Sequence, residues 1–587
     1  MSGRAQRSLS VGEVSPKLHA RADRELYQSA LRTLRNAIVT KEGGVESRPG
    51  TTYCGTTKAS AAARLLPLVL DADQPYVLEM GAGYFRFWLN GAPVTATSIA
   101  AWADATAYTA GVVKSRSAVN YVCLLAHTSN TANDAPGTGT NQATYWYALT
   151  GAVYELPTPY LAAELKTVRW ADDSPGVRFF VHRLHAMREL IRVGAQQWTF
   201  VITTLSAADA VTTPTGVSIT GTAGSTAADD TRYKVTAMIG LLESPVSATV
   251  QWSRYPGTTT FGNFSPITVD WDAVAGATAY RLYRSVQGAA FVLKAQLDST
   301  VLLYLDESLT GGVGTAYTPP TTAQAFTDFT VSGSYPGTIC VYQQRLVLGG
   351  QVNAPDVVYA SRTGSFRNFF PRFPAEDDDA LSWKQVGTRL NRVQHLTESA
   401  GRLVVWSETT EGIVTGDNDG ILRPGEANPR TWSFNGAAAA LVPLSVNDTS
   451  LYVQARGSLV RDLRLTPNSG EGADLTVTAS HLVNGYELLA WCYQQTPHSV
   501  IWAVREDGVL LSLTYQRETG VLGWAHHDTD GLYEDLCVVP EGTEDVVYHL
   551  VQRTINSGVV RYLERTASRD AAIASLVVMD AAVTVSA

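Results

Sequence analysis

Two histidine clusters are the first side chains of this sequence whose types and spacing could do chemistry. His182 and His185 have a spacing that zinc ligands can adopt, but the segment is typical of a β-hairpin and lacks a nearby cysteine and a following Glu-His pattern. The run His526-His527-Asp528 could hold a metal ion or transfer protons. Because it follows Trp524 in a predicted polar turn, we favour a structural or interface role for it.

One acidic run is the other chemical candidate. Glu376, Asp377, Asp378 and Asp379 could supply the paired carboxylates of a glycoside hydrolase, which lie about 5–10 Å apart, but adjacency in a loop does not set that distance. The sequence has no G-x-S-x-G, no Walker loop and no G-x-G-x-x-G that opens a helix. We therefore predict a protein that is not an enzyme, with no cofactor and no metal site.

The composition indicates a large, folded, turn-rich protein. Its 587 residues are enough for several domains, and 45% hydrophobic against 17% charged residues allows large cores. The 48 glycines and 26 tyrosines favour β-structure with many turns. A net charge of -9 argues against a general nucleic-acid binder with a basic face.

The cysteines and the hydropathy of the sequence indicate the cellular compartment in which the protein folds. The five cysteines are scattered and form no C-x-x-C pair, so we expect neither a disulfide framework nor a zinc site. The first residues lack the apolar region of a signal peptide, and no apolar run approaches the roughly 18 residues of a membrane helix. We expect a soluble protein made in a reducing cytoplasm, without a membrane span.

The beginning of the chain predicts a helix followed by an extended arm. Apolar residues recur at helical spacing over 21–38, with Asp23 as a candidate cap. Gly43 and Gly44 can reverse the chain, and Pro49 pushes Arg48 toward an extended conformation. The stretch therefore predicts a turn, an extended arm, a second turn and a strand.

The rest of the chain is dominated by repeated hairpins. Each is an apolar strand, a tight turn with Gly or Asp, and a second strand; they occupy 76–91, 177–194, 402–416, 450–465, 499–515 and 546–565, with a looser version at 344–362. Small sheets that cannot close individually suggest a β-propeller, here an irregular one. A large array of β-sandwiches is the alternative.

Residues 214–320 interrupt this pattern and resemble a fibronectin type III domain. The resemblance is carried by Pro214, Tyr233, Glu243-Ser244-Pro245, Trp271 in "VDWDAVAGATAYRLYR", Tyr280, Tyr283, Tyr304 and Asp306. It implies a sandwich of two sheets with the aromatic rings between them.

Residues 99–150 resemble the small chitin-binding modules of secreted chitinases. Trp102, Tyr108, Gly111, Val112, Val113, Tyr121 and Trp146 fit that pattern, whereas Lys114-Ser115-Arg116 replaces the usual hairpin turn. The resemblance implies sugar stacking through Trp102, Tyr145, Trp146 or Tyr147. The alternative, which we favour, is that these rings form the core of a very small domain.

Four blocks in a fixed order resemble the tail nozzle proteins of short-tailed bacteriophages, also described as tail tubular B-type, packaged-DNA stabilisation or tail-hub proteins. The blocks are "GGVESRPGT" near the start, 154–182, 341–381 and 481–531, with "RYLER" at 561–565 near the end. The resemblance covers about two-thirds of the chain and is interrupted by the two inserts.

The resemblance implies a structural role in a virion. Nozzle proteins form a sixfold ring at the tip of the tail, bind the adaptor above them and neighbour tail fibres or spikes, and conduct double-stranded DNA without binding it specifically. Their fold combines a β-propeller with a platform built partly from the N-terminal arm. Gly43, Gly44, Arg48 and Pro49 would then dock on the adaptor or the next subunit; the alternative for Arg48 is an ordinary surface arginine.

The resemblance also gives the acids and the net charge a role. Six copies at -9 total about -54, a sign that repels phosphates and lets DNA slide. Glu376, Asp377, Asp378 and Asp379 are candidates to face the channel, although a solvated outer loop or a metal-binding turn is the more expected explanation.

Function and domain organisation follow from these expectations. We predict a nozzle located in the virion and assembled in the host cytoplasm; the alternative is a receptor-binding, adhesin-like tail protein that contacts host glycan, and a glycan depolymerase is a weaker third. The expected parts are an arm (1–60), first propeller strands (61–98), the chitin-module-like insert (99–150), propeller strands (151–213), the fibronectin-like domain (214–320), remaining propeller and platform strands (321–570) and a tail (571–587).

Overall fold

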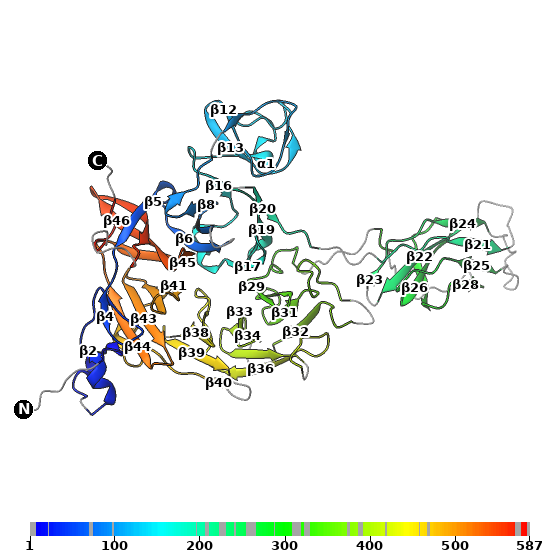
Figure 1. Cartoon of the computed structure of the whole chain (residues 1–587). Helices are drawn as coiled ribbons and strands as arrows, with labels where there is room; N and C mark the ends of the chain where they lie inside the picture. The colour runs from blue at the N-terminus through cyan, green and yellow to red at the C-terminus, as the bar shows by residue number, and fades with distance from the viewer. Residues whose placement is uncertain are drawn as a thin grey trace, which may run out of the picture.

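The computed structural model is mainly β. It describes residues 8–21, 23–69, 74–96, 99–194, 196–205, 211–221, 230–239, 242–253, 266–286, 288–307, 319–321, 329–371, 376–385, 391–416, 419–456, 458–465, 470–569 and 577–583. Seven antiparallel four-strand units, here called blades 1 to 7 in chain order, succeed one another in a propeller-like ring (Figure 1). All seven hairpins expected from the sequence are present within them.

Blades 1 to 4 come from the first three-quarters of the chain. Blade 1 consists of β6 (Ala63–Val69), β7 (Pro75–Gly81), β8 (Tyr84–Leu89) and β16 (Glu155–Pro157), with β9 (Ala92–Pro93) beside β8; blade 2 of β17 (Arg169–Ser174), β18 (Val177–His182), β19 (His185–Gly194) and β20 (Gln197–Ile202). Blade 3 consists of β29 (Thr338–Tyr342), β30 (Arg345–Gly349), β31 (Val357–Ala360) and β32 (Leu381–Lys384); blade 4 of β33 (Val393–Ser399), β34 (Arg402–Ser407), β35 (Glu411–Thr415) and β36 (Asn428–Ser433).

Blades 5 to 7 complete the ring. Blade 5 consists of β37 (Leu444–Val446), β38 (Thr449–Val453), β39 (Val460–Leu465) and β40 (Gly470–Glu471); blade 6 of β41 (Leu488–Gln494), β42 (Val500–Arg505), β43 (Leu510–Gln516) and β44 (Val521–His527). Blade 7 combines β45 (Leu532–Glu541), β46 (Glu544–Ile555) and β47 (Gly558–Thr566) with β5 (Thr51–Thr56) from the beginning of the chain. This shared blade joins early and late segments and closes the ring.

The blades are held together by apolar clusters between neighbouring faces. Successive side chains on a strand point to opposite faces of its sheet, so a blade packed on both sides needs apolar residues at consecutive positions. In β18, Phe180 packs toward blade 1 while Phe179 and Val181 pack toward blade 3. Such clusters join every consecutive pair of blades, including blade 7 with blade 1.

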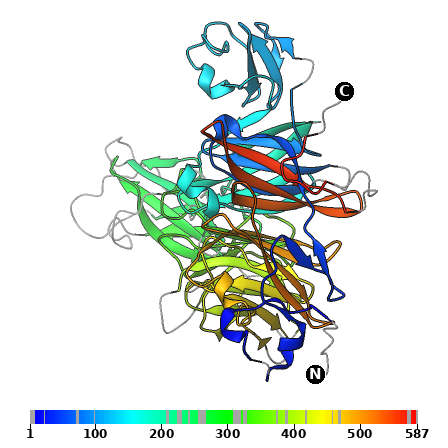
Figure 2. The ribbon, with the colours of Figure 1, turned by 90° about the vertical axis from the view of Figure 1, so that its left-hand side faces the viewer.

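The N-terminal arm extends blade 6 outward. It contains β1 (Gly12–Glu13), the 3-10 helices η1 (Pro16–Leu18) and η2 (Glu25–Ser29), β2 (Ala30–Leu31), β3 (Ala37–Val39), β4 (Val45–Ser47) and η3 (Lys58–Ser60). Strand β1 pairs in parallel with both β44 and β2, so this sheet has six strands. The N-terminal segment, in blue, lies at the end of the molecule beside the orange strands of the late chain (Figure 2). The arm is therefore packed on the outermost strand of blade 6.

The helix predicted over 21–38 is wrong. Only η2 is helical there, and Asp23 pairs with Arg21 instead of capping it. The backbone hydrogen bonds go to distant strands: the amide of His526 donates to Leu34, and the amide of Asn36 donates to His526. These tertiary partners satisfy the backbone in extended form, which overrides the helical spacing of the apolar residues.

The first insert forms a small domain between strands β8 and β16 of blade 1. It contains β10 (Ala100–Ala101), β11 (Ala107–Tyr108), β12 (Val113–Arg116), β13 (Val119–Cys123), β14 (His127–Thr128), α1 (Gln142–Tyr145) and β15 (Trp146–Ala148). Strand β12 continues through Arg116, and the reversal falls on Ser117 and Ala118, both at positive φ. The hairpin turn therefore follows the Lys114-Ser115-Arg116 run, and the likeness to chitin-binding modules stays a prediction.

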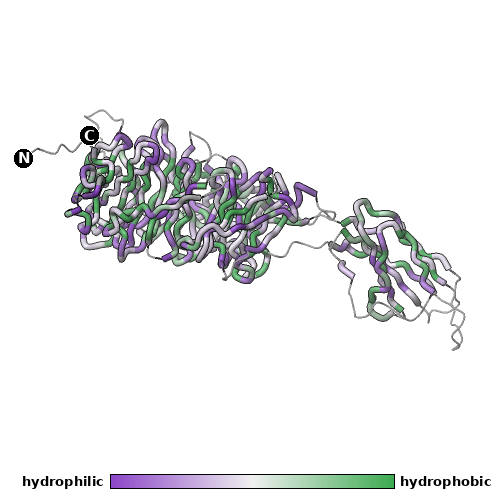
Figure 3. Tube along the Cα trace, turned by 90° about the horizontal axis from the view of Figure 1, so that it is seen from below, coloured by the Kyte–Doolittle hydropathy of each residue, from purple (hydrophilic) through white to green (hydrophobic). Residues whose placement is uncertain are grey.

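The second insert is a two-sheet sandwich that projects beside the ring (Figure 3). One sheet contains β21 (Ser218–Gly221), β25 (Ile267–Asp270) and β28 (Leu303–Asp306); the other contains β22 (Asp230–Ile239), β23 (Leu242–Glu243), β24 (Val250–Ser253), β26 (Ala279–Val286) and β27 (Val292–Asp298). Trp271, Tyr233 and Tyr280 are buried in the cluster between the sheets. The family likeness to fibronectin type III domains stays a prediction.

Candidate functional site

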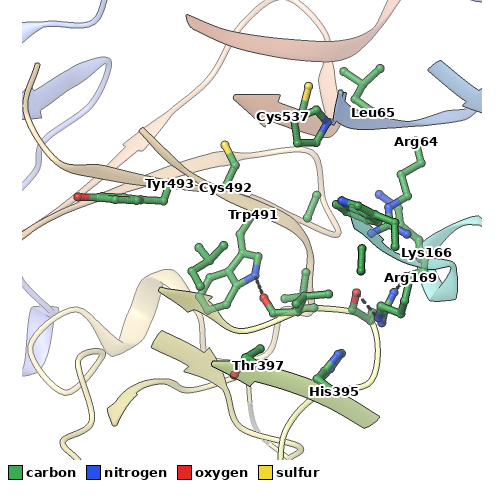
Figure 4. A pocket seen from close by; sticks show the side chains of 18 of the residues that line it. Arg64, Leu65, Lys166, Arg169, His395, Thr397, Trp491, Cys492, Tyr493 and Cys537 are labelled. Carbon is green, nitrogen blue, oxygen red and sulfur yellow. Dashed lines mark hydrogen bonds between the residues drawn. The ribbon is translucent and has the colours of Figure 1, made fainter. Parts of the chain in front are cut away.

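A central cavity is lined by the first strand of every blade. Its volume is about 580 Å³, and β6, β17, β29, β33, β37, β41 and β45 all contribute side chains. Arg64, Lys166 and Arg169 gather on one side of it with His395 beneath them (Figure 4). The cavity was not predicted, because no sequence signal brings the inner positions of seven separate strands together.

The cationic groups of the cavity are held by backbone carbonyls. Arg64 Nη1 donates to the carbonyls of Leu165 and Val168 at 2.7 and 2.8 Å. Arg169 donates through Nη1 to Lys166 and Val168 at 2.8 and 3.0 Å, and through Nη2 to a carbonyl between blades 4 and 5. Two neighbouring guanidiniums are thus anchored by carbonyls and form no ion pair in the described part of the chain, although the charge of Asp535 acts on Arg64 from a longer distance.

Burial and mutual repulsion shape the protonation of these groups. Burial lowers the pKa of Arg64 to about 10, and it lowers the pKa of Arg169 well below its ordinary range, with the charge of Arg64 adding to the effect. The pKa of His395 falls to about 3, first through burial and then through the nearby Arg169. His395 is therefore neutral at physiological pH.

The predicted docking residues form a turn, as expected, but Arg48 is not free. Gly43 has φ 84° in the reversal between β3 and β4, where its amide donates to Thr40 and Gly44 accepts from Thr40. Arg48 is half-buried, with its side chain 9% exposed, and pairs with Asp580 of the same chain at 2.8 Å. This position contradicts an ordinary surface arginine, and the intermolecular pair of Arg48 stays a prediction.

The segment after Arg48 is held by close backbone contacts. Pro49 leads into Gly50, where an added Cβ would lie 2.2 Å from the carbonyl oxygen of Met579. Residues 577–583, expected as part of a tail, run beside β5 through hydrogen bonds that join Thr51 to Met579 and Tyr53 to Ala582. Residues 48–53, which include the predicted docking residues Arg48 and Pro49, are thus attached to residues 577–583 near the other end of the described chain.

The exposed part of the arm carries a groove of about 490 Å³. Leu26 and Tyr27 are 44% and 42% exposed, and Val477 from the loop after β40 is 64% exposed. Arg24 and Arg32 also line the groove and are exposed. This combination of apolar and cationic side chains on the surface is the feature of the arm best suited to bind another molecule.

The acidic run is a folded turn, and one of its members cannot face a channel. Asp379 is fully buried; its carboxylate lies 3.1 Å from Arg362 and accepts the amide of Glu376. The other three acids are exposed, and Asp377 lies 3.2 Å from Arg423. The prediction of four channel-facing acids is wrong for Asp379, because the arginine partner compensates its burial.

The aromatic residues of the first insert form its core. Trp146 is 2% exposed and packs edge-on against Tyr108 at 5.2 Å. Tyr145 is half-buried against His127 at 4.4 Å, and Tyr147 is half-buried and accepts a hydrogen bond from Lys58. The sugar-contact prediction is wrong for Trp146, and the favoured alternative of a core role is confirmed for it.

Trp102 occupies the edge of the same core. It is half-buried, and the guanidinium of Arg116 lies 5.1 Å from its ring centroid. A cation over the ring leaves that face closed to a sugar. The four aromatics therefore do not form an exposed stacking platform.

The histidine pair meets a third polar side chain that sequence reasoning missed. Glu164, from η4 (Ala162–Thr167), lies 2.8 Å from His185, and ligand atoms of Glu164, His182 and His185 all lie within 4.8 Å of one another. Two imidazoles and a carboxylate are a ligand set that zinc accepts. However, His182 already contacts Thr167 and the amide of Leu184, so hydrogen bonds inside the protein account for the cluster.

The second histidine cluster has a structural role. His526 and His527 lie in strand β44, so the predicted turn is wrong, and their contacts within the chain are those of the structural alternative. His526 contacts the buried carboxylate of Glu13, and Asp528 pairs with Arg35, which attaches the arm to blade 6. The five cysteines are all free in this structure.

Comparisons with known proteins leave the family open. No family model matches the chain, and no curated protein matches it. Among solved structures, the chain is similar to the C-terminal WD40 domain of Sif2, with 9% identity and a TM-score of 0.25 over 68% of this chain and 95% of that domain. A TM-score this low does not support a shared fold. The propeller-like description therefore depends on the strand order and on the apolar clusters between blades.

In the part of the chain that the structure describes, no helix has the length and apolarity required to cross a bilayer.

Proposed function

We propose that this protein is a structural component of a short phage tail: the nozzle at the distal end of the portal–adaptor channel. In this role it retains packaged DNA and conducts it during ejection. The proposal originates in the ordered sequence blocks that resemble nozzle proteins. The observation that supports it most is the N-terminal arm, which is fixed to blades 6 and 7 and presents an exposed groove.

The anchoring of the arm gives it the rigidity that a docking element needs. An added Cβ on Gly12 would lie 2.4 Å from the carbonyl oxygen of Trp524, and one on Gly523 would lie 2.6 Å from Val39. These close approaches hold the arm against the edge of blade 6. A binding surface held in one conformation loses less entropy on association than a flexible one.

The groove, in place of Arg48, is the surface we assign to the adaptor. Leu26, Tyr27 and Val477 offer apolar area, while Arg24 and Arg32 favour an acidic partner surface. The sixfold ring, the neighbouring fibres or spikes and the passage of double-stranded DNA belong to the same proposal. The net charge of -9 per copy supports sliding of DNA over tight binding.

The alternative of an adhesin that contacts host glycan has less support. Its candidate rings are buried or half-buried, and Trp146 is part of the core. Retention of the protein on a column of bacterial polysaccharide, lost in Tyr145→Ala while folding is intact, would place this alternative ahead of the nozzle.

The test is gold-labelled antibody against this chain on particles whose genome encodes it, viewed by electron microscopy. We expect label at the tip of a short tail. Label on peripheral fibres, or none on the particle, would overturn the proposal.

The groove is tested in the same particles by complementation. Leu26→Asp should prevent incorporation of the protein into tails because it places a carboxylate in the apolar part of the docking surface. The matched control is Leu305→Asp in the sandwich, where the leucine is also 44% exposed. Equal incorporation of the two variants would refute the docking role of the groove.

A further inference from the structure

The central cavity carries a positive charge that the described protein does not neutralise. Three cationic side chains, Arg64, Lys166 and Arg169, line it together with the carboxylate of Asp535. Asp172, the other acid of the lining, pairs at 2.6 Å with Arg178, which lies outside the cavity. The cationic groups therefore exceed the available carboxylate.

The remaining carboxylate of the lining, that of Asp535, already has partners within the protein. Asp535 lies 2.9 Å from the Lys166 ammonium and accepts the amides of Leu65 and Leu536 at 3.3 and 2.8 Å. No ion pair joins it to either guanidinium in the described residues. Arginine is rarely buried without a partner, because removing its charge from water is costly.

Two buried polar atoms at the cavity also have no partner. Nε of Arg169, a donor, and Nδ1 of His395 form no hydrogen bond in the described part of the chain. Because Nε2 of the neutral His395 ring donates to the carbonyl of Ala438 at 2.8 Å, its Nδ1 is an acceptor that suits the O–H of a hydrogen phosphate. Arg169 and His395 are 5% and 1% exposed. Buried polar groups are nearly always hydrogen-bonded, so unpaired atoms beside a cavity indicate a missing group.

We propose that the central cavity binds a small phosphate oxyanion, either free phosphate or the phosphate of a small phosphomonoester. The guanidinium fork matches the oxygens of phosphate, and an ammonium adds a further charge-assisted hydrogen bond. A cavity of about 580 Å³ is within the usual size of small-molecule sites. Lys166 is 34% exposed and marks the side from which solvent reaches the site.

The test measures binding of inorganic phosphate to the full chain by calorimetry and by the thermal midpoint, at constant ionic strength with chloride as reference. We expect saturable binding that Lys166→Gln weakens about tenfold or more, because one charge-assisted hydrogen bond is lost. Glutamine can still donate to Asp535, so the variant should fold. The control is Lys384→Gln, which alters an exposed Lys–Asp pair on the outer strand of blade 3.

A second readout uses the wild-type protein alone. Phosphate should shift the ring-nitrogen signals of His395, assigned with His395→Gln, with the same midpoint as the calorimetry. Tighter binding of a nucleoside monophosphate than of phosphate would identify an ester as the ligand, whereas equal or weaker binding would identify free phosphate. The proposal is overturned if saturation is absent at about 10 mM phosphate, if Lys166→Gln and Lys384→Gln respond alike, or if only carboxylates such as citrate bind.

Discussion

Removal of the Arg48 guanidinium should loosen the junction between the two ends of the described chain. Arg48 Nη2 lies 3.1 and 2.8 Å from the carboxylate oxygens of Asp580, and the two side chains are 9% and 17% exposed. Truncating one partner of a buried ion pair costs about 3–5 kcal/mol, because the other charge is left uncompensated. Asp580 retains some contact with water and its segment can open locally, so we expect Arg48→Met to cost about 2–3 kcal/mol.

The assay is urea unfolding of Arg48→Met, Asp580→Asn and the double variant, together with hydrogen exchange of residues 577–583. The cycle should show a coupling free energy of about 1.5 kcal/mol or more, and exchange should accelerate in both single variants. Arg21→Met is the control, because the Arg21–Asp23 pair is 49% and 61% exposed and should not affect stability measurably. Additive single effects, or an Arg48→Met effect equal to that of the control, would refute the reasoning.

Two further predictions concern the arm and the buried histidines. Gly12→Ala should accelerate hydrogen exchange of the arm, because φ is 65° and the new Cβ would collide with Trp524; Gly83→Ala, at φ 78° but in open space, is the control, and equal exchange would contradict the steric argument. Burial lowers the pKa of His395 and His549 to about 3, below the ordinary value of about 6.5. The unfolded chain therefore binds more protons below pH 6.5, so the thermal midpoint should fall from pH 7 to pH 5; a constant or rising midpoint would contradict this.

The blades were predictable because their signal is local. Short, nearly continuous apolar runs broken by glycine turns specify hairpins such as β7–β8 and β42–β43 within about fifteen residues. A local pattern was also the reason for the wrong helix prediction over 21–38. Leu34 and Ile38 have helical spacing, but they pack on blades 6 and 7. The apolar pattern indicates which side chains are buried, but it does not indicate which segment of the chain they pack against.

The candidate sites were less predictable because their partners are distant in the sequence. Asp580 lies 532 positions from Arg48, and nothing near Arg48 indicates it. The third member of the histidine cluster, Glu164, comes from the segment before the hairpin. The cavity corresponds to no sequence motif, because each blade contributes only a few inner residues to its lining.

The composition of blade 7 has a consequence for how the protein is made. Its strands come from residues 51–56 and 532–566. During synthesis, blade 7 therefore cannot form beside blade 1 until nearly the whole chain has been made. In that interval the apolar faces of Leu65, Val77 and Trp88 lack β45, β46 and β47, the strands of blade 7 that later pack on them. Synthesis that stops before β45 therefore yields a ring with a gap, flanked by two apolar faces suited to adhere to another incomplete copy.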